Sequence, residues 1–188
     1  MRKILLAAMM GLASLCPRCS GQPWHTISEA APLAAGPDTI SVMIVGDVMM
    51  HSRQLEYDFH SFLSDIAPSM KAADLTLANM EFPLAGKPYS GYPVFSTPDE
   101  YAYYAAEDCG VDVMMLANNH VLDKGVSGFR RTLRTYSAMR DSMKVFYTGA
   151  AADSADYRRT TPLMLAVGGV RLAFINFSYG SNMRSSEP

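Results

Sequence analysis

The chain has 188 residues, of which 49% are hydrophobic, 18% charged and 10% aromatic. This composition fits one globular domain with a sizeable core and excludes an intrinsically disordered chain. The formal net charge of −2 excludes the strongly basic surface that is typical of nucleic-acid-binding proteins.

Residues 1–21 have the features of a secretory signal. Arg2 and Lys3 precede an apolar stretch at 4–15, which "CPRCSGQP" then interrupts. The stretch is too short to span a bilayer as a permanent helix, so it favours export over a buried first helix. Cys16 or Cys19 is a candidate for lipid attachment, although neither follows the small residue usual in lipoprotein signals. We therefore expect a periplasmic or cell-surface protein, and the sequence leaves a lipid anchor open.

Residues 22–38 contain Pro, Gly and Ala without periodicity, which predicts a linker between the leader and a domain at 39–188. Removal of the leader takes away three basic residues and changes the formal net charge from −2 to −5. Cys109 then remains as the single cysteine, so the mature domain has no internal disulfide. The expected role of Cys109 is a buried core thiol.

The first half of the domain predicts alternating strands and helices. The short apolar run at 39–47 predicts a buried strand, and apolar residues at helical spacing predict a helix over 55–70. A second strand follows at 73–81. After a long loop, "TPDE" predicts a helix that is capped by Thr97 in a capping box and ends near Gly110.

The second half continues the alternation. A third strand is predicted at 111–118, a helix with its apolar face at 126–136, and a fourth strand at 144–149. Residues 162–177 predict two strands joined by a hairpin turn at Gly168-Gly169. The pattern indicates an α/β fold with a mainly parallel sheet, helices on both faces, and a closing hairpin that makes the sheet mixed.

Polar residues collect where three predicted strands end. The three segments are Gly46-Asp47, Asn79-Met80-Glu81 and Asn118-Asn119-His120. The carboxyl ends of parallel strands share one edge, where open α/β folds bind their ligands. Carboxylate and amide oxygens together with imidazole suit Mn²⁺, Fe²⁺ or Zn²⁺. The sequence therefore predicts a metal site at this edge.

Each of these residues also has a purely structural explanation. Asp47 can cap a helix, Glu81 can be a solvated loop acid, and His120 can be a hydrogen-bonded structural histidine. Asparagines are common in turns. The occurrence of such residues after three successive strands favours a functional site over three separate coincidences.

A 15-residue loop, "FPLAGKPYSGYPVFS", follows Glu81. Loops of this length without secondary structure are uncommon in compact domains and are often functional. The loop is therefore predicted to be a binding loop or lid beside the strand ends. Tyr89 and Tyr92 are candidates for substrate contacts, and surface packing explains them equally well.

Four motifs now identify a family resemblance. In their order and spacing, "GDVMMH", "NMEFPL", "YSGYPVFSTPDE" and "ANNHVLDKG" make the chain resemble the bacterial poly-γ-glutamate capsule-synthesis family of CapA type. That family belongs to the calcineurin-like metallophosphoesterase superfamily, and the resemblance covers about residues 40–179. It implies a layered α/β sandwich with a divalent metal centre, of two ions in a complete domain, at the strand ends.

The resemblance also implies roles for single residues. Asp47 corresponds to the first metal-binding acid and Glu81 to the bridging carboxylate. Asn119 resembles the asparagine ligand of the Asn-His motif. His120 resembles the histidine that protonates a leaving group or steadies the phosphoryl charge, and Asp123 is expected to orient it.

One motif departs from the superfamily pattern. The opening motif of the superfamily is Asp-x-His, whereas Met49 occupies the histidine position here and His51 lies two residues further on. His51 is therefore a candidate metal ligand, and an exposed histidine at the start of a helix is an equal alternative.

Two functions are compatible with these features. The first is a metal-dependent hydrolase or transferase of the cell envelope that acts on a phosphoester or an anionic polymer. The second is a non-catalytic accessory protein that binds capsule polymer or partner subunits at the membrane. The second function would be favoured by a basic patch that binds an anionic polymer, for which the candidates are Arg130, Arg131, Arg134, Arg158 and Arg159. Ordinary solvated surface explains these arginines better.

The histidine content leads to one more expectation. Of the four histidines, only His51 and His120 lie near the predicted strand ends, and none follows position 120. The resemblance implies further histidine ligands from later strands. We therefore expect the domain to be incomplete at its C-terminus, with weak metal binding and an exposed apolar edge.

Overall fold

The structure is a computed structural model that describes residues 25–26 and 39–182. The predicted signal at 1–21, with Cys16 and Cys19, lies outside the described residues. So does the predicted linker at 22–38, apart from residues 25 and 26.

Four parallel strands form the central sheet in the order β2-β3-β4-β5. They are β2 (Val42–Val48), β3 (Leu75–Met80), β4 (Val113–Met115) and β5 (Phe146–Thr148). β3, β4 and β5 lie inside the apolar runs that predicted strands, and β2 extends one residue beyond the run predicted at 39–47. The first four residues of β3 are all buried, as expected for a strand that is covered on both faces.

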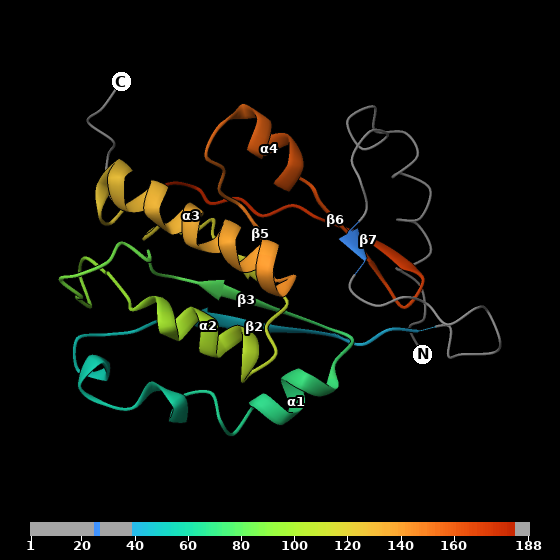
Figure 1. The fold of residues 1–188 in the computed structure, drawn as a ribbon, viewed down its shortest axis with the longest axis horizontal. Helices are drawn as coiled ribbons and strands as arrows, with labels where there is room; N and C mark the ends of the chain where they lie inside the picture. Colours follow the sequence, from blue (N-terminus) through green and yellow to red (C-terminus); the bar gives the residue numbers. More distant parts are fainter. Residues whose placement is uncertain (1–24, 27–38, 183–188) are drawn as a thin grey trace.

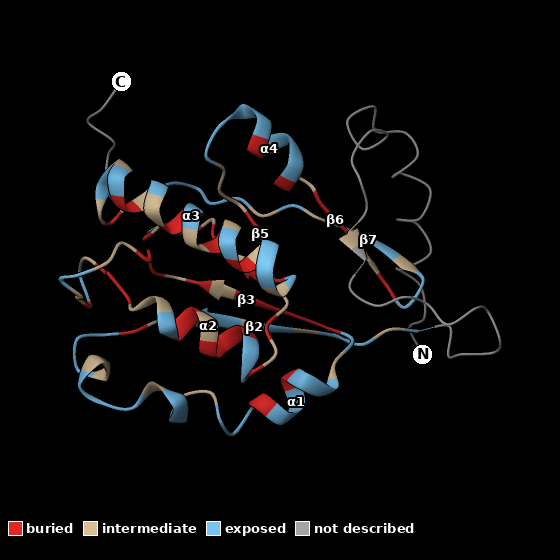
Figure 2. Cartoon of the chain, viewed as in Figure 1, coloured by how far each residue is buried: buried red, intermediate tan, exposed pale blue. Residues whose placement is uncertain are grey.

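Three helices cover one face of this sheet (Figure 1). They are α1 (Ala67–Ala72), α2 (Asp99–Glu107) and α3 (Gly125–Met143). The main core lies between the helices and the sheet, and Figure 2 shows buried residues along β3 and on α2 and α3. Cys109 is buried in this core as a free thiol, which agrees with its predicted role.

A second, three-stranded sheet covers the other face. Its order is β1-β6-β7, with β1 (His25–Thr26), β6 (Leu163–Val167) and β7 (Val170–Phe174). A second core joins Leu77, Val113 and Phe146 of the parallel sheet to Leu165 of β6. The α/β sandwich is confirmed, but the expectations of helices on both faces and of a single mixed sheet are wrong. The hairpin buries its apolar face on the parallel sheet instead of extending that sheet's edge.

The turn of this hairpin agrees with its prediction. Gly168 and Gly169 have φ angles of 54° and 82°, which is the left-handed pair that a two-residue hairpin loop needs. Strand β1 was not predicted, because its two residues lie in the segment expected to be a linker. Helix α4 (Ser154–Thr160) was also missed, although Asp153 caps it by accepting from the amides of Ala155 and Asp156.

The single helix predicted over 55–70 is wrong. The segment folds as two short 3₁₀ turns, η2 (Gln54–Glu56) and η3 (Phe59–Ser61), followed by α1. The Asp58 side chain accepts from the backbone of His60, and such a local hydrogen bond competes with a continuous helix. Pro68 lacks an amide hydrogen and is placed in the first turn of α1, where none is needed.

The predicted cap of α2 is also wrong. The helix begins at Asp99, with Pro98 rather than Thr97 at the N-cap position and no capping box. The helix ends at Glu107, and Gly110 turns the chain with a φ of 81°. The buried hydroxyl of Thr97 has no hydrogen-bond partner among the described residues.

The loop at 82–96 is packed against two neighbouring segments. Leu84 donates its amide to Thr132 of α3, and Gly91 donates to the hydroxyl of Ser52. A side chain at Gly91 would meet backbone atoms, since an added Cβ would lie 2.0 Å from the amide nitrogen of Ser52. The loop is therefore docked by contacts that require a glycine at position 91.

We predict that Gly91→Ala undocks this loop. Overpacking of this kind costs about 1–3 kcal/mol of unfolding free energy, which urea denaturation would measure. Gly180→Ala is the control, because nothing lies within 4 Å of a Cβ at that position. Equal stability of the Gly91 variant and the control would contradict the docking described here.

Candidate active site

A bulge in β2 places Asp47 beside Asn79. Val45 pairs with Ala78 and Asp47 pairs with Asn79, so Gly46 is the extra residue in β2. Without this bulge, Gly46 rather than Asp47 would stand opposite Asn79. Bulges often reorient side chains next to functional sites, and this one brings the carboxylate of β2 to the end of β3.

The amide of Asn79 joins two carboxylates. Its Nδ2 donates to Asp47 Oδ1 at 2.8 Å and to Glu81 Oε2 at 3.1 Å. Asn118 fixes this orientation, because its Nδ2 lies 3.3 Å from Asn79 Oδ1 and 3.0 Å from the carbonyl oxygen of Met80. The ends of β2, β3 and β4 are thus connected by side chains, and we call this cluster the strand-end site.

The strand-end site concentrates negative charge. Burial, and after it the nearby charge of Asp47, raise the pKa of the Glu81 carboxyl above its ordinary value. The charge of His120 and the hydrogen bond from Asn79 act in the opposite direction without overcoming the first two. The neutral amide of Asn79 holds the two carboxylates in place but does not neutralise them.

His120 lies next to these carboxylates in a fixed orientation. Its Nδ1 is 2.7 Å from Asp123 Oδ2, and its Nε2 is 3.9 Å from Glu81 Oε1. Both His120 and Asp123 are buried, and the ring of Phe95 meets the imidazole edge-on at 4.7 Å between centroids. A carboxylate that accepts from Nδ1 turns Nε2 toward the side of Glu81, where Nε2 also lies 3.4 Å from Asn182 Nδ2.

Asp123 also holds the loop. The same Oδ2 accepts from the amide of Phe95 at 2.8 Å, so one carboxylate oxygen binds the loop and the histidine together. Its other oxygen, Oδ1, is buried without a hydrogen-bond partner among the described residues. Asp123 therefore fixes the ring of His120 and the backbone of the loop at the same point.

Two predicted ligands lie elsewhere. The side chain of Asn119 is exposed, while its backbone carbonyl accepts from the amide of Asn182. His51 is exposed and contacts the rings of Tyr92 and Phe95, at 6.4 and 5.2 Å between centroids. The structure thus brings Asp47, Glu81, His120 and Asp123 together but not the side chains of Asn119 and His51.

Sequence reasoning gave no role to the two asparagines that connect the site. Asn79 and Asn118 stand at the ends of predicted strands, and this position is the feature of the sequence that could have indicated their role in the site. Which of two adjacent asparagines, 118 or 119, points inward depends on how the backbone turns after β4. A strand pattern does not specify that turn.

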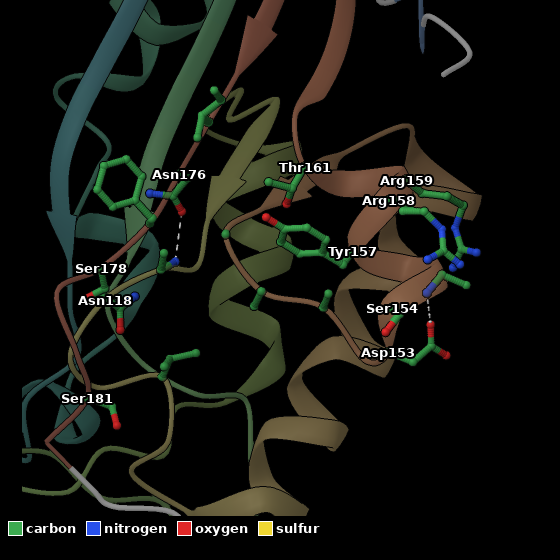
Figure 3. Close-up of a pocket in the computed structure, with 18 of the residues that line it drawn as sticks. Asn118, Asp153, Ser154, Tyr157, Arg158, Arg159, Thr161, Asn176, Ser178 and Ser181 are labelled. Atoms are coloured by element: carbon green, nitrogen blue, oxygen red, sulfur yellow. Dashed lines mark hydrogen bonds between the residues drawn. The ribbon is translucent and has the colours of Figure 1, made fainter. Parts of the chain in front are cut away.

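A large hollow of about 1360 Å³ opens beside the strand-end site. Asn118 and the segment after β7, with Asn176 and Ser178, line one side of it, and α4 with Tyr157 and Arg158 lines the other (Figure 3). Asn176 ties the two neighbouring chain segments together, because its Oδ1 accepts from the amide of Ala117 at 2.9 Å. The hollow has room for a ligand that reaches Asn118.

The donor chemistry of the strand-end site suits a divalent cation. Asp47 and Glu81 both supply carboxylate oxygens, and a bound cation would offset the charge of Asp47 that, together with burial, raises the pKa of Glu81. In the described part of the chain, however, no group of three or more His, Cys, Asp or Glu side chains is arranged to hold a metal ion. The described residues therefore do not by themselves form a complete coordination shell.

Comparison with known proteins shows the family. Residues 41–188 match the family of bacterial capsule synthesis proteins described as "Bacterial capsule synthesis protein PGA_cap", and the chain belongs to this family. The resemblance found in the sequence motifs is thus confirmed. Within the described residues, no helix has the length and apolar character needed to cross a membrane.

Individual relatives are longer proteins. The chain is 30% identical over 158 residues to two uncharacterized proteins of Sinorhizobium fredii, y4sH and y4uA, which covers 80% of the chain and 33% of each relative. It is 25% identical over 150 residues to the capsule biosynthesis protein CapA of Bacillus anthracis, which covers 75% of the chain and 35% of that protein. The chain thus spans about a third of the length of these relatives.

Removal of the Glu81 charge is predicted to stabilise the fold at neutral pH. Because the pKa of Glu81 is raised in the folded state, ionisation opposes folding above that pKa, and the penalty disappears as the pH falls toward the ordinary value of 4.5. In a chelating buffer, Glu81→Gln should therefore unfold at higher urea concentration than the wild type near pH 7, and the difference should shrink toward pH 4.5. If the stability difference between Glu81→Gln and the wild type instead grew on acidification, this would contradict a raised pKa of Glu81.

Asp123→Ala is predicted to loosen both the loop and the histidine. It leaves the Phe95 amide and His120 Nδ1 without their acceptor, at a cost of about 1–3 kcal/mol in unfolding free energy. The ¹⁵N shifts of His120 should also report mixed tautomers. Asp123→Asn is the control, because its remaining oxygen can still accept from Phe95. Unchanged His120 shifts in the alanine variant would contradict a positioning role.

Proposed function

We propose that this chain is part of a metal-dependent hydrolase or transferase of the cell envelope that acts in capsule biosynthesis. The observation that carries this proposal is the strand-end site, where two carboxylates and a carboxylate-oriented histidine share one edge of the sheet. The family membership and the similarity to a capsule biosynthesis protein support the biological setting. Export through the leader at 1–21 would place the protein in the envelope.

In this proposal, Asp47 and Glu81 hold a divalent cation, with Asn79 and Asn118 keeping both carboxylates in place. Such a cation, when bound, supplies an acidified water and a positive charge for a phosphoryl or acyl oxygen. His120 in its protonated form gives its Nε2 proton to the leaving group, and Asp123, by accepting from Nδ1, keeps the ring in the orientation for this step. Phe95 excludes water from one edge of the ring.

The substrate is proposed to enter through the large hollow. Asn118 is common to the hollow and to the strand-end site, so a ligand in the hollow would contact a residue that holds the site together. Tyr157, Ile175 and Phe177 expose apolar surface around the hollow, whereas Arg158 brings positive charge. This combination suits a ligand with both an apolar part and an anionic group.

A non-catalytic accessory role is the second candidate. It is favoured by one observation, namely the absence of a three-residue metal cluster within the described residues. In that case the chain would bind polymer or partner subunits, and the loss of Asp47 would leave such binding intact.

The catalytic proposal predicts a loss of turnover in two variants. Mn²⁺ should raise the thermal midpoint of the wild-type chain, and the protein should cleave an aryl phosphodiester. Asp47→Ala removes a cation ligand, and His120→Ala removes the proton donor. Each should lower turnover by at least about a hundredfold, in line with the size of general acid contributions.

Matched controls come from the same chain. Asp65→Ala and His60→Ala remove an exposed carboxylate and an exposed imidazole outside the strand-end site, and both should keep wild-type turnover. The catalytic proposal fails if the two site variants hydrolyse the diester as fast as these controls. Polymer binding without turnover in any of the proteins would favour the accessory role.

A further inference from the structure

A second hollow, away from the large one, is lined by positive charge. It has a volume of about 320 Å³ and lies between the loop and the start of α3. Four of its lining residues are basic, namely Lys87, Lys124, Arg131 and Arg134, and no lining residue is acidic. We call this cavity the basic hollow.

One of the four cations is already neutralised. Arg131 forms two hydrogen bonds of 2.8 Å to the carboxylate of Asp99 and another to the carbonyl oxygen of Leu84. It therefore fastens the loop to α3. Glu100, next to Asp99, is the other acid that acts on Arg131. The pair formed by Arg131 and Asp99 gives the hollow a rigid wall.

The other three cations have no carboxylate partner. Lys87, Lys124 and Arg134 form no ion pair with any residue in the described part of the chain. Lys87 instead lies 5.9 Å from the centroid of the Tyr89 ring. In a chain with a formal net charge of −2, three unpaired cations around one cavity create a local positive potential.

The first turn of α3 adds to this potential. The helix has 19 residues, no acidic residue in its first turn and no side-chain N-cap, while the amide of Gly125 donates to the carbonyl oxygen of Leu122. The helix dipole and the remaining amides of the first turn favour an anion at the N-terminus. Ser127 of this turn lines the hollow and adds a hydroxyl donor. The three cations and the uncapped helix are independent features that favour the same kind of ligand.

The backbone around the hollow is closely packed. At Gly128, an added Cβ would lie 3.1 Å from the Cβ of Ala85, and at Gly86 it would lie 3.2 Å from Nε of Arg131. These two glycines allow the loop to lie directly on α3. The hollow is thus a built feature of the loop and helix, not a gap between mobile side chains.

We propose that the basic hollow binds the oxyanion groups of a polyanionic chain. The hollow fits one carboxylate or phosphate group with its neighbouring atoms, and its open side allows the rest of a polymer to continue across the surface. The choice of a polymer rests on the proposed role in capsule biosynthesis. The affinity for an oxyanion rests on Lys87, Lys124, Arg134 and the start of α3 alone.

The test measures binding of two probes by fluorescence anisotropy, a labelled oligoglutamate and labelled tripolyphosphate. The triple variant Lys87→Gln, Lys124→Gln, Arg134→Gln leaves Arg131 and its structural bonds in place. It should bind at least about tenfold more weakly than the wild type at low salt, which is the effect of losing a few charge-assisted contacts. Wild-type binding should weaken as NaCl is raised.

The matched control removes the same charge elsewhere. Arg53→Gln, Arg130→Gln, Lys144→Gln changes three exposed cations outside the basic hollow, and it should keep wild-type affinity within about twofold, as screened distant charges do. If the wild type binds oligoglutamate more tightly than tripolyphosphate, the hollow is assigned to a carboxylate polymer. If it binds tripolyphosphate more tightly, the hollow is assigned to a phosphate polymer.

Two results would overturn this proposal. One is equal weakening of probe binding in the two triple variants, which would mean that binding depends on the net charge of the protein and not on the basic hollow. The other is the absence of wild-type binding to either probe. The same measurement in the Asp47→Ala background separates this proposal from the catalytic one, because the basic hollow contains no strand-end residue. Binding should persist there whether or not the protein has phosphodiesterase activity.

Discussion

The parallel pairing of β2, β3 and β4 is the constraint on which the rest of the site depends. Parallel strands end at the same edge, and the bulge at Gly46 adjusts the register so that Asp47 stands opposite Asn79. Burial on both faces fixes this register, because a slip by one residue would exchange the side chains that β3 contributes to the two cores. The helix layer and the second sheet thus keep the carboxylates in place without contacting them.

Asn79 explains how two carboxylates can lie so close together. A lysine or arginine at this position would neutralise the pair and occupy the space between the carboxylates. The amide donates one hydrogen to each carboxylate and leaves the charge in place, and the pKa of Glu81 rises as a result of burial and this charge. A protein gains little stability from such an arrangement. This small gain in stability supports the proposal that the cluster serves as a ligand site.

The sequence predicted the central sheet well, because strands β2 to β5 are apolar runs that are buried by neighbouring layers. It predicted the second sheet poorly, because an apolar hairpin can extend one sheet or cover its face, and periodicity is the same in both cases. The helix predicted over 55–70 failed because Asp58 and Pro68 interrupt it locally. In the site, strand ends located Asp47, Glu81 and His120. Only the turn after β4 decides that Asn118 points inward and Asn119 outward.

The loop at 82–96 lies between the strand-end site and the basic hollow, and consecutive residues of the loop contribute to the two. Phe95 contacts His120 and donates its amide to Asp123, while the next residue, Ser96, lines the basic hollow. Lys124 likewise follows Asp123 and lines the same hollow. The loop is already fixed on α3 by the bond from Leu84 to Thr132, and on Asp123 before this helix by the bond from Phe95. The same docked segment therefore holds the partner of His120 in place and forms one wall of the basic hollow.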